Sequence, residues 1–284
     1  MQNNDTRYYS GEKRGVTQRV GSSKIGKKAR KSGYLTAQTA AMWIAYAAVL
    51  VMNALIEGGR LGGVTSADVT FQVFTWFTPA PYVFAIWSVV YIAIAVWLVG
   101  YTRNAPLRTQ RFGPTEVLFV ASCALNIVWL TVFHLQFVTL ALIVIAALWV
   151  VMAALYLTVR RTSTSGIGWI PISIYTAWVT VATVTNAANL ITRWLDGGIP
   201  VLNELSVIAL SAGVLALGYL MRARYKDSVV QIVFLWAIVG VGVNVVPANA
   251  FVALIVFLLA AAAAVLTYVP ANSLKNLRRA VAAS

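Results

Sequence analysis

The chain has 284 residues, of which 60% are hydrophobic and 11% are charged, and its formal net charge is +14. Soluble domains average about 25% charged residues. A single water-soluble core of this size cannot bury so much apolar surface, so lipid must cover a large part of it. The only cysteine, Cys123, lies in an apolar run, which excludes a disulfide framework.

Residues 1–35 are predicted to form a disordered cytoplasmic tail. They hold nine basic side chains against two acidic ones, a net charge of +7 and half of the total. Few of their residues are large aliphatics, so the segment cannot bury a core of its own. A basic tail next to a membrane is attracted to anionic lipid head groups. This distribution of the charge argues for a membrane partner and against nucleic-acid binding.

Eight apolar segments follow the tail, each close to the length of about 20 residues that a membrane-spanning helix needs. They are residues 36–56, 80–101, 115–134, 138–159, 168–191, 201–221, 229–246 and 249–269. The links between the third and fourth and between the seventh and eighth are very short, so each pair is predicted to form a tight antiparallel hairpin.

The basic residues test this count of spans. With the N-terminus in the cytoplasm, 20 of the 22 basic residues fall in cytoplasmic segments, and only Arg60 and Arg193 fall outside. Cytoplasmic loops collect Lys and Arg, and one span more or fewer would reverse the side of every later loop. We therefore expect an all-α, polytopic transmembrane helix bundle with both termini in the cytoplasm, in the inner (plasma) membrane of a bacterium.

The predicted spans lack the groups that most membrane chemistry uses. No Lys, Arg, Asp or Glu lies near the middle of any span, and such residues mark proton relays, ion-coupled transport and retinal attachment. One histidine, His134, and one cysteine cannot build a metal site. The residues thus predict no catalytic group, no metal ligand and no required cofactor.

Three predicted spans instead carry aromatic and amide side chains three or four residues apart, which places each set on one helix face. The sets are Phe84, Trp87 and Tyr91; Asn126, Trp129 and Phe133; and Tyr175, Trp178, Ala182, Asn186 and Asn189. Helix packing is the better explanation for any one of these residues alone. Their convergence from three spans favours a site for a flat, hydrophobic ligand.

The segment between the first two spans, residues 57–79, is the longest outside loop. It ends in three aromatic residues, Phe74, Trp76 and Phe77, followed by Pro79 and Pro81. Aromatic side chains favour burial over contact with water, and prolines restrict the backbone at the entry into the second span. We expect this loop to fold over the outer end of the bundle as a lid.

A residue spacing of the fifth span is repeated in the seventh. Trp178, Ala182 and Asn186 are spaced by four residues, and the seventh span repeats this spacing with Trp236, Gly240 and Asn244. Such a repeated spacing is a weak indication of an internal repeat. It predicts either a second polar stripe or a contact between helices.

Three stretches resemble the tryptophan-rich sensory protein family (TspO/MBR, the translocator proteins or peripheral benzodiazepine receptors). Residues 77–91 resemble that family's loop and second helix, residues 124–129 its third-helix motif, and residues 175–186 its fifth-helix motif. The chain departs from the pattern where Ala80 separates the two prolines and where Thr185 replaces a usual leucine. The resemblance covers residues 36–191 and leaves residues 192–284 as three additional helices and a short basic tail.

The resemblance implies a dimeric five-helix bundle with a pocket closed by the loop between the first two helices. Family members bind porphyrins, haem, sterols and benzodiazepine-type drugs. By position in the motifs, the implied ligand-binding residues are Trp87, Tyr91, Asn126, Trp129, Tyr175, Trp178, Ala182 and Asn186. The implied lid or entrance residues are Phe77, Pro79, Pro81 and Phe84.

These observations lead us to expect a membrane-embedded receptor, carrier or sensor for a flat hydrophobic molecule, such as a porphyrin-type tetrapyrrole or a sterol. Porphyrin or haem would be bound as a ligand. Two alternatives remain open at this stage. One is a transporter for a small neutral solute that depends on Asn186 and Asn244. The other is a light-dependent porphyrin-degrading activity, which rests on family resemblance alone.

Overall fold

The computed structural model describes residues 36–58, 65–104, 112–195 and 199–268. The predicted tail of residues 1–35 and the C-terminal tail from residue 269 onward lie outside the described residues. Within the described ranges all regular structure is helical, and no strand occurs.

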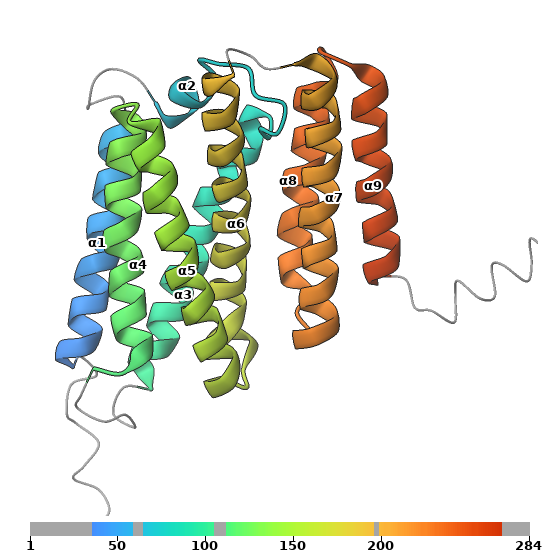
Figure 1. Ribbon diagram of the computed structural model, residues 1–284. Coiled ribbons are helices and arrows are strands. Elements are labelled where there is room, and N and C mark those ends of the chain that lie inside the picture. Colours follow the sequence, from blue (N-terminus) through green and yellow to red (C-terminus); the bar gives the residue numbers. More distant parts are fainter. Residues whose placement is uncertain (1–35, 59–64, 105–111, 196–198, 269–284) are drawn as a thin grey trace, which may run out of the picture. The chain divides into compact units, whose positions relative to one another are not determined.

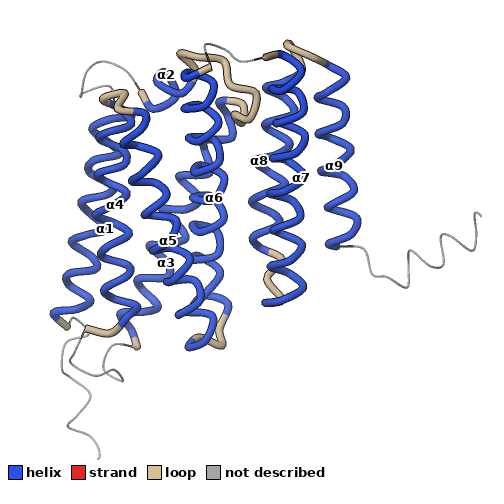
Figure 2. The backbone as a smooth tube through the Cα atoms, viewed as in Figure 1, coloured by secondary structure: helices blue, strands red, loops and turns tan. Residues whose placement is uncertain are grey.

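The described residues form eight long helices, which run alongside one another (Figures 1 and 2). They are α1 (Ala37–Glu57), α3 (Ile86–Arg103), α4 (Pro114–His134), α5 (Val138–Thr162), α6 (Gly166–Trp194), α7 (Pro200–Tyr225), α8 (Val229–Val245) and α9 (Ala250–Tyr268). Each of the eight predicted spans corresponds to one of these helices. Seven helical segments of the described chain are long and apolar enough to cross a membrane, and α8 is a shorter apolar helix of 17 residues. The predicted all-α, polytopic bundle is confirmed.

Two short helices precede α3. The α2 helix (Ser66–Thr70) lies across one end of the long helices (Figure 1), and the 3-10 helix η1 (Pro81–Ala85) leads directly into α3. Pro81 is at the start of η1, where a missing backbone N–H costs least. The loop predicted for residues 57–79 is therefore partly helical, and its residues 59–64 lie outside the described ranges.

The two predicted hairpins are confirmed. The α4 and α5 helices pack along each other, as do α8 and α9. The turn after α4 is closed by Gln136, whose φ of 62° is left-handed, and by a hydrogen bond of 3.0 Å from the Phe137 amide to the Val132 carbonyl.

The α6 helix is the centre of the packing. It contacts α3, α5 and α8, whereas α1 packs against α4 and α3. The C-terminal helices α7 and α9 pack chiefly on α8 and on each other. The α8 helix is thus the main link between the C-terminal helices and the five that precede them.

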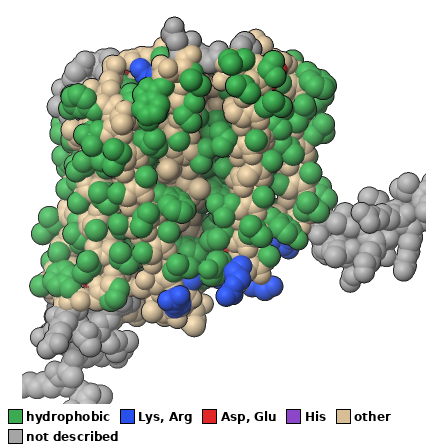
Figure 3. Space-filling model, viewed as in Figure 1, with side chains coloured by type: hydrophobic (Ala, Val, Ile, Leu, Met, Phe, Trp, Pro, Cys, Tyr) green, Lys and Arg blue, Asp and Glu red, His purple; other side chains and the backbone are tan. Residues whose placement is uncertain are grey.

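The outer surface is apolar over the middle of the helices (Figure 3). Ile44 is 72% exposed and Phe251 is 70% exposed, as expected for side chains that face lipid. Basic residues gather at one edge of this view (Figure 3), where α3, α5 and α7 end. Those at the ends of the three helices are Arg103, Arg160, Arg161, Arg222, Arg224 and Lys226. That this edge faces the cytoplasm stays a prediction.

One buried carboxylate joins α8 to the core at the same end. Asp227 is fully buried, and its Oδ2 accepts hydrogen bonds from the Tyr156 hydroxyl at 3.0 Å and the Ser173 hydroxyl at 2.6 Å. Its Oδ1 accepts from the amides of Val229 and Val230 at 2.9 and 3.4 Å. A buried polar group of this kind is stable only when it is paired, and here its partners lie on α5, α6 and α8.

Candidate ligand-binding site

A cavity of about 480 Å³ lies between α1, α3, α4 and α6, at the end that carries α2. This volume is within the range of about 300–1,000 Å³ that small-molecule sites occupy. The lining residues are Asn53, Ala54, Glu57, Ser66, Thr70, Pro79, Pro81, Phe84, Ala85, Trp87, Ser88, Tyr91, Trp129, Leu130, Phe133, Trp178, Ala182, Thr185, Asn186 and Asn189.

Aromatic rings from three helices form the walls of the cavity. Trp87 on α3 is central to them. Its ring stacks on Tyr91 with centroids 5.6 Å apart, lies 5.9 Å from Trp129 on α4, and stands perpendicular to Trp178 on α6 at 6.1 Å. Phe84 meets Trp178 edge-on at 6.0 Å. These separations are those of favourable aromatic pairs, so the rings hold one another in place around the space.

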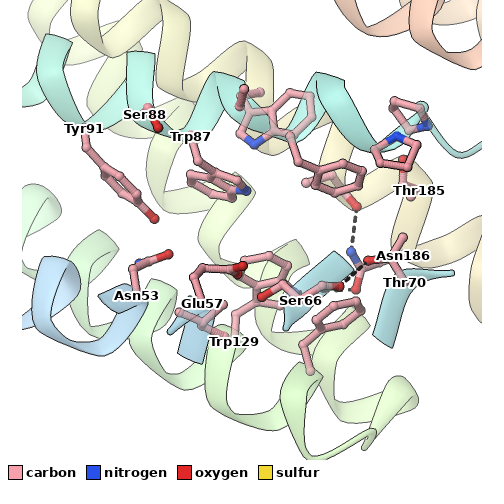
Figure 4. A pocket seen from close by; sticks show the side chains of 18 of the residues that line it. Asn53, Glu57, Ser66, Thr70, Trp87, Ser88, Tyr91, Trp129, Thr185 and Asn186 are labelled. Atoms are coloured by element: carbon pink, nitrogen blue, oxygen red, sulfur yellow. Dashed lines mark hydrogen bonds between the residues drawn. The ribbon is translucent and has the colours of Figure 1, made fainter. Parts of the chain in front are cut away.

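Amide groups join two of these walls. The Trp129 indole N–H points at the Asn186 side-chain oxygen at a long 3.5 Å, and the Asn186 amide donates to the Ala182 carbonyl at 2.8 Å. Figure 4 shows Asn186 held by both contacts beside the cavity. Asn53 and Glu57 face the same space from α1 (Figure 4), so the cavity has a polar side next to its aromatic walls.

Three polar atoms at the cavity have no hydrogen-bond partner among the described residues. They are the indole nitrogen of Trp178, the hydroxyl of Thr185 and the hydroxyl of Ser66, and each is buried. All three residues line the cavity. Buried polar groups are almost always paired, so these three atoms, on residues that line the cavity, are exceptions among the described residues.

Six of the eight expected ligand-binding residues line the cavity, namely Trp87, Tyr91, Trp129, Trp178, Ala182 and Asn186. The other two, Asn126 and Tyr175, do not. Instead, the Asn126 amide donates a hydrogen bond to the Tyr175 hydroxyl at 3.1 Å, and the Tyr175 ring contacts that of Trp87 at 6.2 Å. The pair therefore supports an aromatic wall from behind.

Three of the four expected entrance residues, Pro79, Pro81 and Phe84, line the cavity, and Phe77 does not. Phe77 is 1% exposed and belongs to the hydrophobic core. We call residues 75–85 the entrance segment. The Asn189 amide on α6 donates to the Thr75 hydroxyl of this segment at 3.3 Å, which joins the segment to the cavity wall.

The α2 helix covers part of the same end. Ser66 and Thr70 line the cavity, and α2 packs against α4. Thr65 donates to the Asp68 carboxylate from its amide and from its hydroxyl, each at 2.7 Å. These hydrogen bonds lower the pKa of the exposed Asp68 below its ordinary value, because they stabilise its charged form.

Several lining residues were not among those expected from the sequence. Asn53 and Glu57 are four residues apart in the last turns of α1, and this spacing was the signal that places both on one helix face. Thr185 lies three residues after Ala182 and immediately before Asn186, so it extends the α6 stripe, which already included Asn189. Ser66 and Ser88 carried no sequence signal.

A family model described as TSPO-like protein matches residues 39–269. The matched range is longer than the five helices suggested by the sequence motifs. It includes α7, α8 and α9, so the match extends over these three helices as well. No curated protein and no solved structure matches the chain. With its apolar helices and a match over most of its length, the chain is an integral membrane protein that belongs to the TSPO-like protein family.

Proposed function

We propose that the protein binds a flat hydrophobic small molecule in this cavity, as a receptor, carrier or sensor. The observation that carries the proposal is the meeting of Trp87, Trp129 and Trp178, from three different helices, at one space of about 480 Å³. Each wall offers an aromatic face or edge, and the small side chain of Ala182 leaves room between them.

Burial and stacking supply the binding energy in this proposal. Removing about 200 Å² of apolar ligand surface from water contributes about 5 kcal/mol, and favourable aromatic contacts add about 0.5–1.5 kcal/mol each. Loss of the ligand's free motion costs at least about 4 kcal/mol. A ligand that touches only one wall would therefore bind weakly, and a flat molecule that contacts several rings is favoured.

Two of the unpartnered polar atoms belong to α6 residues that line the cavity. The Trp178 indole N–H can only donate, and the Thr185 hydroxyl can donate or accept. We therefore propose a ligand that carries an acceptor, such as a ring nitrogen or a carbonyl oxygen, and that gains a hydrogen bond if the α6 wall adjusts to expose the Trp178 indole. A porphyrin-type tetrapyrrole is the first ligand to test and a sterol is the second.

The experiment is a titration of purified protein with protoporphyrin, followed by tryptophan fluorescence. The emission should be quenched and should saturate, and Trp178→Phe and Trp129→Phe should each remove much of the quenching. Trp149→Phe is the matched control, because Trp149 is on α5 and does not line the cavity. Unchanged emission at saturating protoporphyrin would contradict binding of this ligand.

The geometry favours binding over solute transport along the two related stripes. Asn186 lines the cavity, but Asn244 donates to the Thr75 carbonyl at 3.3 Å, and none of the lining residues is on α8. The stripes of α6 and α8 therefore do not face one shared space.

A further inference from the structure

The α8 stripe that repeats the α6 spacing contacts the entrance segment. The Trp236 indole donates to the Val83 carbonyl at 3.2 Å, and the Asn244 amide donates to the Thr75 carbonyl at 3.3 Å. Between them, the Gly240 carbonyl accepts a hydrogen bond from the Ala80 amide at 3.0 Å. All three members of the stripe thus bind the same stretch of chain.

The three contacts follow one order. Asn244 contacts Thr75, Gly240 contacts Ala80, and Trp236 contacts Val83. The residue numbers rise in opposite directions, so the segment runs antiparallel to α8. In every case the group bound on the segment belongs to its main chain. Irregular backbone at the depth of a membrane needs protein partners for its polar groups, and α8 supplies three of them.

Gly240 permits the close approach that these contacts require. A Cβ at this position would overlap the Cγ2 of Val83 and would lie 3.4 Å from the Cβ of Pro79. Beside it, the Tyr82 ring meets the Trp236 ring edge-on at 5.5 Å. The glycine therefore marks the point where the segment lies directly against the α8 backbone.

The opposite side of the segment faces α6 and the cavity. Asn189 binds the Thr75 hydroxyl, Phe84 packs on Trp178, and both Pro79 and Phe84 line the cavity. A displacement of the segment away from α8 would consequently move part of the cavity wall.

We infer that Trp236, Gly240 and Asn244 are positioning residues, through which α8 holds the entrance segment closed over the cavity and sets how fast a ligand exchanges. The part that concerns ligand exchange rests on the proposed binding function, whereas the part that concerns the segment does not. This inference gives the C-terminal helices a role at a cavity that they do not line.

The first experiment measures opening of the segment without any ligand. Thr78 is 2% exposed and its hydroxyl is unpartnered, so Thr78→Cys places a small thiol where only an opened segment can react. In full-length protein with Cys123→Ala, the rate of maleimide labelling at position 78 reports opening.

Trp236→Phe and Asn244→Ala each remove one part-buried hydrogen bond, and Gly240→Ala adds a Cβ that overlaps Val83. Each variant should raise the labelling rate about tenfold. Trp236→Phe removes the donor together with part of the indole, whereas Asn244→Ala removes a donor and no aromatic ring, so the two variants together separate the hydrogen bond from aromatic packing. Val243→Ala, on the exposed side of α8, and Gly213→Ala, where a Cβ meets nothing within 4 Å, should leave the rate unchanged. Equal rates in all variants would overturn the inference.

The second experiment measures the dissociation rate of protoporphyrin from the same variants. The account predicts about tenfold faster dissociation for Trp236→Phe and no change for Val243→Ala. If wild-type protein does not bind protoporphyrin while labelling responds as predicted, the proposed ligand is wrong and the positioning role stands. If wild-type protein binds it and neither rate responds to Trp236→Phe, the positioning role is wrong and the binding function stands.

Discussion

The rings of Trp87 and Trp178 stand perpendicular to each other, with their centroids 6.1 Å apart, at one corner of the cavity. Trp87 is on α3 and Trp178 is on α6, and the two helices pack together. A planar ligand in this corner can stack on one ring while its edge meets the face of the other. Both kinds of contact are favourable for aromatic groups.

Trp87 should therefore contribute more to binding than any cavity residue that belongs to one wall alone. Trp87→Ala removes a ring that contacts Tyr91, Trp129 and Trp178, and we expect protoporphyrin binding to weaken roughly 30-fold, or about 2 kcal/mol. Equilibrium titration measures the change. Trp194→Ala, at a residue 70% exposed, should bind like the wild type; equal losses in both variants would place the ligand elsewhere.

Tyr175 should matter for stability more than for affinity. Tyr175→Phe removes the acceptor for the Asn126 amide and leaves a buried donor unpaired, so the free energy of unfolding should fall by about 1–3 kcal/mol. Ligand affinity should stay within about threefold. Thermal denaturation in detergent gives the first quantity, with Tyr219→Phe, at a residue 46% exposed, as the control. A variant as stable as the wild type would contradict the role assigned to this pair.

Asp227 should hold α8 on the core. Asp227→Ala leaves the hydroxyls of Tyr156 and Ser173 and two main-chain amides without their acceptor, and we expect a loss of about 3 kcal/mol of stability. The melting temperature measures it. Asp68→Asn, at an exposed residue, should change the melting temperature little. Equal melting temperatures of the two variants would contradict the role assigned to Asp227.

The α2 helix should loosen in acid. The pKa of Asp68 is lowered in the folded protein from its ordinary value of 3.8, so its contribution is complete above that value and disappears as the pH falls through the folded pKa. Amide exchange of residues 66–70 should thus be constant from about pH 8 to pH 5, after correction for intrinsic rates, and faster below about pH 4. In Asp68→Asn this dependence should be absent, and its persistence would assign it to another group.

Spacing along the helices was enough to predict much of the cavity. The α3 and α6 stripes placed Trp87, Trp178, Ala182 and Asn186 on single faces, and all four line the cavity. Spacing alone does not say which neighbour a face meets. For that reason Asn126 and Tyr175, on faces shared with lining residues, pair with each other behind the wall.

Other features depend on tertiary contacts that no local pattern reveals. Glu57, at the end of α1, has the sequence pattern of a polar residue at a membrane surface, and it borders the cavity because residues of α2, α3 and α4 line the same space. Asp227 lies in a short basic link and is nevertheless fully buried. The α8 stripe of Trp236, Gly240 and Asn244 was visible in the sequence as a repeated spacing. Its partner is the main chain of the entrance segment, and no pattern of side chains in the sequence marks a main-chain partner.

The most direct test of the account is to fill the cavity and measure binding. Ala182 is 9% exposed and lines the space between the aromatic walls, so Ala182→Phe should abolish saturable protoporphyrin binding while the helical circular dichroism stays unchanged. Ala187→Phe places the same side chain on the same helix at a position that does not line the cavity and should bind like the wild type. Equal binding by both variants and the wild type would contradict the claim that this cavity is the ligand site.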